Sequence, residues 1–241
     1  METNKIYHED CLVTLSKMPD GFVDMVITSP PYNVGYNQMY GEDTTKYDTY
    51  EDNKKQDDYD LWLNNIIDEL LRVTKKHIFF NIQMLGNNKT TVLKLLGKYS
   101  DKIKDIIIWN KKQAPPHIEQ GIMNSKFEFI IIFSNQSPEK KKFYDAKFKG
   151  NFNNVIDGIN ASKNEYADVH KATYPLYLPR TILTKFGDAN EIVYDPFMGT
   201  GTTAIASLME GRFFIGSEID KTYFDLSNKR INNFLQQQTL F

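Results

Sequence analysis

The chain has 241 residues, of which 41% are hydrophobic and 13% aromatic, so it can bury a sizeable core and is not a disordered polypeptide. Its formal net charge of -2 excludes a polycation that binds nucleic acid through net charge, and leaves only a local basic surface for that purpose. The lone Cys11 excludes an internal disulfide and a thiolate metal cluster.

The N-terminus lacks a basic and then apolar signal segment, and no apolar run is long enough for a membrane helix. We therefore expect a cytoplasmic protein with no membrane partner. The four histidines are scattered and show no ligand spacing, so the sequence predicts no metal site.

Apolar runs rich in β-branched residues predict strands, and stretches with apolar residues three and four apart predict helices. The predicted strands are 6–8, 23–28, 77–82, 105–110, 127–133, 191–195 and 213–220. The predicted helices are 59–73, 178–186, 202–211 and 223–235. This alternation indicates an α/β fold: a Rossmann-like, mostly parallel sheet of about seven strands with helices on both faces.

No helical pattern separates the predicted strands 105–110 and 127–133, which predicts one antiparallel pair at an edge of the sheet. The length favours one domain, 1–241. Two polar segments are expected to loop out of it: the acidic segment 34–58, as a lid, and the basic, aromatic and Asn-rich segment 134–170.

The stretch TSPPYN, residues 28–33, ends the predicted strand 23–28. Pro30 and Pro31 fix φ and remove two backbone donors, while Tyr32 adds a large ring. A rigid functional loop explains this stretch, and so does a proline-rich surface loop with Tyr32 packed on it.

The stretch DPFMGTGTT, residues 195–203, leads from a strand through a glycine turn into a helix. It lacks the lysine of a phosphate loop, and Ala204 replaces the last glycine of GxGxxG. Glu218 ends the next strand seventeen residues after Gly201, near the spacing at which an acid binds ribose hydroxyls. The pair predicts an adenosine-containing ligand, with a turn that binds no ligand as the alternative.

Ligands of open α/β sheets lie beyond the carboxyl ends of the strands, where both motifs stand. If their strands are neighbours, the proline stretch and the glycine turn face one site. A non-catalytic DNA-binding module and an NAD-dependent dehydrogenase are alternatives, although the dehydrogenase leaves TSPPYN unexplained.

TSPPYN followed far downstream by DPFMGTGTT resembles the S-adenosylmethionine-dependent DNA amino-methyltransferases, in particular the permuted β group, whose catalytic motif precedes the cofactor loop. The likeness runs from IYHEDCL through IIWNK and FEFIIIFSN to GSEID. RNA and protein-amide methyltransferases have a similar proline motif, but there the cofactor loop normally comes first.

The resemblance implies a role for each matching residue. The catalytic set is Ser29, Pro30, Pro31 and Tyr32. The residues implied to hold the methionine part of the cofactor are Asp195, Phe197, Gly199, Gly201, Thr202 and Thr203. Glu218 would bind the ribose and Asp10 the adenine, with a helix N-cap as the alternative for Asp10.

The chemistry fits these residue types. An exocyclic base amine is a poor nucleophile, so it needs acceptors, which Ser29 Oγ and the Pro30 carbonyl could supply. The base must be flipped out of the duplex, and stacking on Tyr32 would return roughly 1 to 3 kcal/mol. Methylation at carbon 5 needs a thiolate, and Cys11, in an N-terminal strand context without a preceding proline, excludes it.

In this family a serine-led tetrad favours N4 of cytosine, with N6 of adenine as the alternative. The segment 140–154 interleaves lysines with Phe143, Tyr144 and Phe148, which predicts a target-recognition region or an exposed charged loop. HKATYPLYLPRTIL resembles the cofactor-side helix entry, opened by His170, although Lys171 stands where related chains often have proline. DNA is the expected partner, and a homodimer and a companion restriction endonuclease stay open.

Overall fold

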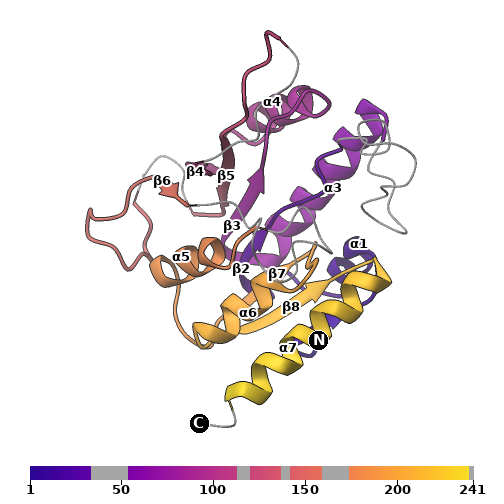
Figure 1. The fold of residues 1–241 in the computed structure, drawn as a ribbon, viewed down its shortest axis with the longest axis vertical. Helices are drawn as coiled ribbons and strands as arrows, with labels where there is room; N and C mark the ends of the chain where they lie inside the picture. The colour runs from indigo at the N-terminus through magenta and orange to yellow at the C-terminus, as the bar shows by residue number, and fades with distance from the viewer. Residues whose placement is uncertain (34–53, 113–119, 137–141, 159–173, 239–241) are drawn as a thin grey trace.

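A sheet runs through the middle of the protein (Figure 1). The computed structural model describes residues 1–33, 54–112, 120–136, 142–158 and 174–238. Within them, eight strands follow the order β1-β8-β7-β2-β3-β5-β4-β6 across the sheet. The strands are β1 (Lys5–Tyr7), β2 (Val23–Thr28), β3 (Thr74–Ile82), β4 (Ile103–Asn110), β5 (Phe127–Ser134), β6 (Val155–Asp157), β7 (Ile192–Asp195) and β8 (Phe213–Ser217).

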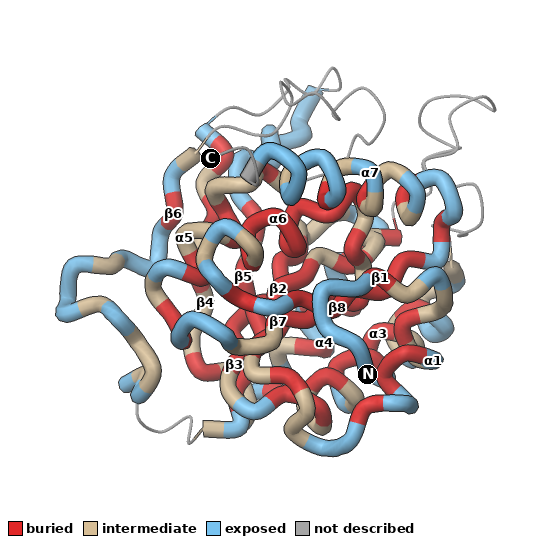
Figure 2. The backbone as a smooth tube through the Cα atoms, turned by 90° about the horizontal axis from the view of Figure 1, so that it is seen from below, coloured by how far each residue is buried: buried red, intermediate tan, exposed pale blue. Residues whose placement is uncertain are grey.

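Helices cover both faces of this sheet. They are α1 (Cys11–Ser16), α3 (Gln56–Val73), α4 (Lys89–Lys98), α5 (Tyr177–Lys185), α6 (Thr202–Met209) and α7 (Lys221–Gln238). Figure 2 shows the buried strands between α5, α6 and α7 on one side and α1, α3 and α4 on the other. None of the described helices combines the length and apolar character that crossing a bilayer requires.

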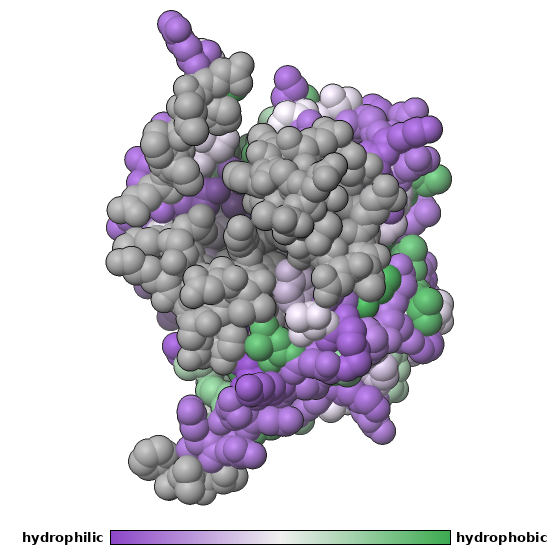
Figure 3. All heavy atoms as spheres, turned by 45° about the vertical axis from the view of Figure 1, so that its right-hand side comes forward, coloured by the Kyte–Doolittle hydropathy of each residue, from purple (hydrophilic) through white to green (hydrophobic). Residues whose placement is uncertain are grey.

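Alternate residues of the central strands pack into two hydrophobic cores, one on each face of the sheet, because successive side chains of a strand point to opposite faces. Ile78 and Phe80 of β3 pack with α1, α3 and α4, whereas Phe79 packs with α5 and with Ala206 of α6. In a smaller hydrophobic cluster, Ile231 of α7 packs against residues of α6 and β8. The outward face of α7 is hydrophilic (Figure 3).

The predicted Rossmann-like α/β fold is confirmed. Strand β5 runs antiparallel to both β3 and β4, and every other pairing is parallel. The short β6 continues the sheet beyond β4, so the antiparallel pair lies one strand in from the edge. Three residues within an Asn-rich stretch are too short a run to show strand periodicity.

Two helices are absent from the predicted set, although the first follows from the N-cap alternative given for Asp10. The first, α1, has only six residues, and it places Cys11 at a helix start rather than in the strand context that was expected. The second, α4, contains paired threonines and Gly97, which lower helix propensity and hide its apolar stripe. The predicted strand 213–220 ends at Ser217, where the chain leaves the sheet.

The two predicted excursions are described only in part. Of the segment 34–58, residues 34–53 lie outside the described residues, and α3 begins at Gln56. Of the segment 134–170, residues 142–158 supply β6 and pack Phe143 and Phe148 on Phe186, with ring centroids 5.2 and 5.4 Å away. The buried His77 joins this segment to the sheet, with its ring nitrogens 3.0 Å from Ser134 Oγ and 2.8 Å from Asp145 Oδ1.

These contacts make Phe143 and Phe148 part of the core packing and leave Tyr144 exposed. The target-recognition role of this segment and the lid role of 34–58 stay predictions.

Candidate functional site

The strands that carry the two sequence motifs are neighbours. Strand β2 pairs in parallel with β7, so both motifs leave the sheet at the same edge. The Thr28 hydroxyl donates to Asp195 Oδ1 at 2.7 Å, which joins the first residue of TSPPYN to the first residue of DPFMGTG. The prediction that the two motifs share one edge of the sheet is confirmed.

Asp195 is a buried carboxyl that organises the glycine loop. Besides Thr28, its Oδ1 accepts from the Phe197 backbone N–H at 3.0 Å. Its Oδ2 accepts from the Thr203 hydroxyl at 2.6 Å and the Tyr174 hydroxyl at 3.2 Å. Burial raises the pKa of Asp195. These contacts tie β2, β7 and α6 together, and a direct contact of Asp195 with the cofactor stays a prediction.

The loop itself depends on glycine. Gly199 and Gly201 have φ of 53° and 81°, in the left-handed region that side chains disfavour. A Cβ at Gly201 would lie 3.2 Å from Ser227 Cβ of α7. Arg230, also of α7, donates to Thr202 Oγ1 at 3.0 Å and holds the loop from outside. The backbone before α6 is therefore fixed in a left-handed turn that packs closely against α7.

Glu218 follows β8 and lies against this loop. Its Oε2 accepts from the Gly199 N–H at 2.7 Å, and its Oε1 accepts from the Asp220 N–H at 2.8 Å. The residue is only 8% exposed, and burial raises its pKa to about 7. Each oxygen keeps a further lone pair that can accept a hydroxyl. The carboxyl and the glycine turn together fit an adenosine ligand.

Asp10 caps α1, since its Oδ1 accepts from the Leu12 N–H at 2.8 Å. The N-cap alternative is therefore confirmed. Strand β1 pairs with β8, and the Glu218 N–H donates to the Tyr7 carbonyl at 3.0 Å, which brings the Asp10 turn to the strand end that carries Glu218. An additional adenine contact by Asp10 stays a prediction.

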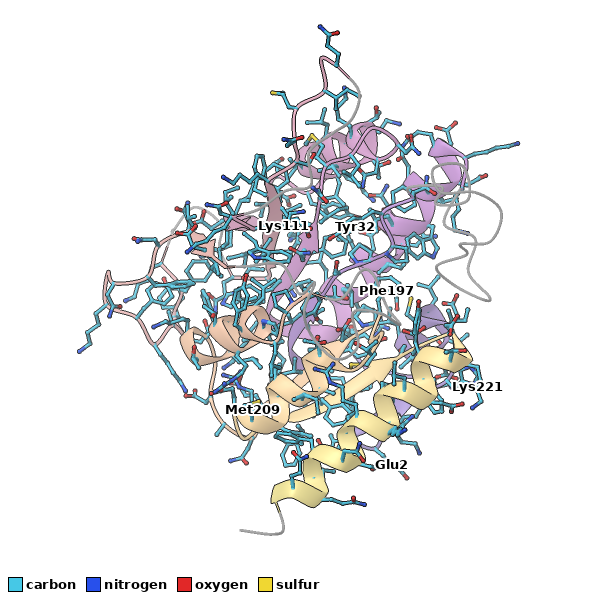
Figure 4. The ribbon with its side chains drawn as sticks, viewed as in Figure 1. Glu2, Tyr32, Lys111, Phe197, Met209 and Lys221 are labelled. Carbon is cyan, nitrogen blue, oxygen red and sulfur yellow. The ribbon has the colours of Figure 1, made fainter. Side chains whose placement is uncertain are left out.

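The proline stretch is held from α3. The Tyr59 hydroxyl of α3 donates to the Pro31 carbonyl at 2.7 Å. Trp62, one turn later, contacts Phe197 of the glycine loop, with ring centroids 5.6 Å apart. Tyr32 is partly buried, and its hydroxyl oxygen lies 2.9 Å from Ser29 Oγ. Figure 4 shows Tyr32 and Phe197 toward the middle of the molecule.

Three polar residues that the sequence interpretation missed complete this edge. Glu128 Oε2 accepts from the Tyr32 hydroxyl at 2.8 Å and from Asn81 Nδ2 at 2.7 Å. Lys111 Nζ donates to Glu128 Oε1 at 3.1 Å. Asn81 lies in β3, Lys111 directly follows β4, and Glu128 lies in β5; each is at least nine-tenths buried. A polar residue inside the apolar runs FFNI and FEFIIIF was the available signal.

Cys11 is buried, and burial raises the pKa of its thiol, so it is no nucleophile. Among the described residues, no group of three or more His, Cys, Asp or Glu side chains could hold a metal ion. His170 and Lys171 of the predicted helix entry lie outside the described residues, whereas Tyr174 reaches Asp195.

Comparisons with known proteins agree with this geometry. A family model described as a DNA methylase matches residues 23–229. The chain is 28% identical to the type II methyltransferase M.BglII of Bacillus subtilis, over 98% of this chain and 73% of that protein. It is 27% identical to the DNA adenine methyltransferase YhdJ of Escherichia coli (strain K12), over 96% and 83%.

Solved structures share the fold. The PvuII DNA methyltransferase (cytosine-N4-specific) superposes with a TM-score of 0.71 at 16% identity, over 98% of this chain and 93% of that chain. The complex of M1.HpyAVI with SAM gives 0.67 at 22% identity, over 95% and 98%.

Proposed function

Because the chain belongs to the DNA methylase family, whose members take their methyl group from S-adenosylmethionine, we propose that it methylates the exocyclic amine of a flipped-out DNA base, with N4 of cytosine favoured. The observation that supports this most directly is the Thr28–Asp195 contact, which puts the proline stretch beside the glycine loop. The dehydrogenase considered from the glycine turn alone has no place in this family.

When bound, S-adenosylmethionine supplies a methyl group on a positively charged sulfur. The glycine turn would lie against its methionine part and Glu218 would accept the ribose hydroxyls, as the loop geometry and the spare carboxyl lone pairs allow. Gly199, Gly201 and Glu218 would hold the cofactor at the carboxyl end of β7 and β8, and β2 pairs with β7 there.

Ser29 and Pro30 act on the base. Ser29 Oγ and the Pro30 carbonyl accept the two amine N–H bonds, which draws the nitrogen lone pair out of conjugation and toward the methyl group. The Tyr59 bond to the adjoining Pro31 carbonyl holds this backbone rigid. Tyr32 stacks on the flipped base and offsets part of the flipping cost.

The serine at the head of the tetrad favours cytosine, and N6 of adenine is the alternative, favoured by the similarity to the adenine methyltransferase YhdJ. A homodimer and a companion restriction endonuclease stay predictions, and relatives such as M.BglII are named type II methyltransferases.

Two substitutions test the assignment. Tyr32→Ala should lower the rate of tritiated methyl transfer to unmodified DNA by about tenfold to a hundredfold, the value of a lost base stack. S-adenosylhomocysteine binding, measured by calorimetry, should change less than about twofold. Gly201→Val should abolish that binding, because the side chain meets Ser227 at a φ of 81°. Equal loss of binding and transfer in Tyr32→Ala, with an unchanged melting temperature, would contradict the assignment.

A further inference from the structure

We propose that Glu128 and Lys111 are positioning residues for methyl transfer: through the Tyr32 hydroxyl they fix the direction of the Ser29 proton, so that Ser29 Oγ meets the target amine with its lone pairs. This inference rests on the proposed function and deepens it, because neither residue belongs to the proline stretch.

The Lys111–Glu128 pair is buried at the β4–β5 hairpin. The strand register places Trp109 opposite Glu128, and the Lys111 N–H donates to the Lys126 carbonyl at 2.9 Å, so the backbone fixes both partners. The two side chains are 8% and 9% exposed. A buried ion pair contributes little net stability compared with apolar residues of the same volume. A chemical role for the pair therefore has to come from what Glu128 contacts.

Glu128 faces two donors with its second oxygen. Opposite the Lys111 ammonium it is a carboxylate, which only accepts hydrogen bonds. Its Oε2 takes the Tyr32 proton at 2.8 Å and an Asn81 amide proton at 2.7 Å. Burial, followed by the charge of Glu128, raises the pKa of Tyr32 well above its ordinary value, so the phenol keeps its proton. The Tyr32 O–H therefore points at Glu128.

This direction decides the next bond. Tyr32 has only one hydroxyl proton, which Glu128 accepts, so in the 2.9 Å contact between Tyr32 and Ser29 the serine is the donor. Asn81 Nδ2 has two protons: one goes to Glu128, and the other is shared between the Tyr32 oxygen, at 2.9 Å, and Ser29 Oγ, at 3.4 Å. Ser29 thus donates to Tyr32 and keeps a lone pair for the target amine.

The polarity of this chain of hydrogen bonds matters for the reaction. If Ser29 pointed its proton at the amine, it would hold the lone pair that must attack the methyl group. Because the Ser29 hydroxyl donates its hydrogen bond to Tyr32, Ser29 Oγ can only accept an N–H bond of the amine, which is the role that methyl transfer requires.

Asn81, the other donor to Glu128, also carries a buried acceptor. Its side chain is 4% exposed, and no described residue donates to its Oδ1. The amide cannot be turned over to satisfy it, because the oxygen would then face the Glu128 carboxylate. A buried acceptor without a partner costs free energy until a donor approaches, and because both amine protons go to Ser29 and Pro30, that donor has to be another group of a bound ligand.

The test is a double-mutant cycle in single-turnover methyl transfer to unmodified DNA at saturating S-adenosylmethionine. Glu128→Gln should slow transfer at least about tenfold, while the dissociation constant of S-adenosylhomocysteine stays within about twofold. Tyr32→Phe, which keeps the ring, should cost a similar factor. Because Glu128 acts through the Tyr32 hydroxyl, the double variant should be no slower than Tyr32→Phe. If the double variant were slower than Tyr32→Phe by the further factor that Glu128→Gln costs alone, the inference would be overturned.

Two further variants separate positioning from packing. Glu128→Leu with Lys111→Met removes both charges at similar volume; it should stay folded, with a lower melting temperature because the Tyr32 hydroxyl and the Asn81 amide lose their acceptor, and be as slow as Glu128→Gln. Full activity of that variant would overturn the inference. Glu191→Gln is the matched control, because Glu191 is a mostly buried carboxylate paired with Lys76 and Arg212 just before β7, at the opposite end of the strands. It should transfer methyl at the wild-type rate, and an equal loss there would also overturn the inference.

The wild-type protein distinguishes the two proposals. If it transfers no methyl group to DNA, the proposed function fails and this inference with it. If it does so and Glu128→Gln matches it, only this inference fails.

Discussion

Burial raises the pKa of Glu218, beside the glycine loop, to about 7, so its proposed contact with the ribose predicts that cofactor binding depends on pH. Ribose hydroxyls donate hydrogen bonds, so they favour the ionised form. S-adenosylhomocysteine should therefore bind about tenfold more tightly at pH 8 than at pH 6, since ionisation rises from about a tenth to nine-tenths over that range. Calorimetry at both pH values measures this, and a flat profile would contradict the assignment of Glu218.

The same carboxyl affects the stability of the ligand-free protein in the opposite sense. Its pKa in the folded state lies above the ordinary 4.5, so its contribution is fully present below about 4.5 and is lost as the pH rises through about 7. Glu218→Gln should remove the pH dependence of binding together with this loss of stability. If the Glu218→Gln variant kept the wild-type pH profile, the titration would belong to another group.

For single residues, the sequence predicted which side chains belong to the candidate site better than it predicted which other side chains they contact. Ser29, Tyr32, Gly201 and Glu218 were predicted as site residues because each stands in a motif of recognisable spacing that follows a strand. The interpretation placed Asp195 against the cofactor, which stays a prediction, but did not foresee its four protein contacts, which organise the loop. Such contacts depend on side-chain directions after folding, which spacing does not contain.

Among the elements, α3 connects the two motifs. Tyr59 and Trp62, three residues apart on one face of the helix, reach Pro31 and Phe197 respectively. The apolar period of 59–73 predicted the helix, but not that this face spans both strand ends.

This geometry makes Tyr59→Phe informative. The change removes one buried hydrogen bond, which should cost about 1 kcal/mol of unfolding free energy in urea. It should also slow methyl transfer several-fold, because the Pro31 carbonyl loses its donor, and leave cofactor binding unchanged. Tyr99→Phe is the control, since its hydroxyl bonds to Asp68 at 2.7 Å on the same face of the sheet but outside the site. Equal slowing in both variants would contradict a positional role for Tyr59.

The β4–β5 hairpin shows where prediction from sequence stopped. Its strands and antiparallel pairing followed from the two apolar runs and the helix-free loop between them. Lys111 and Glu128 form an ion pair only because of the register between β4 and β5. This register is set by the folded hairpin and is not contained in either apolar run of the sequence alone.

For the whole molecule, the order of the strands along the chain differs from their order across the sheet. This difference brings TSPPYN, at the end of β2, beside the distant glycine loop. The chain passes from β2 through β3, β4, β5 and β6 before it returns as β7 beside β2. Residues separated by 167 positions, Thr28 and Asp195, thus become hydrogen-bond partners. The rule that ligands bind at the carboxyl ends of parallel strands put both motifs at one edge of the sheet, but it left the pairing of their strands as a condition, which β2 and β7 meet. The short β6 and the packing of 142–158 on Phe186 were not foreseeable, because they carry no periodic signal.

The central claim is that this arrangement delivers a methyl group to the amine of a DNA base. Nucleoside mass spectrometry of DNA from methylation-deficient cells that express the chain tests it most directly, with cells expressing Tyr32→Ala as the control. We predict N4-methylcytosine, strongly reduced in the control; N6-methyladenine would keep the amine chemistry and change the base. DNA with no methylated amine, or with 5-methylcytosine instead, would contradict it.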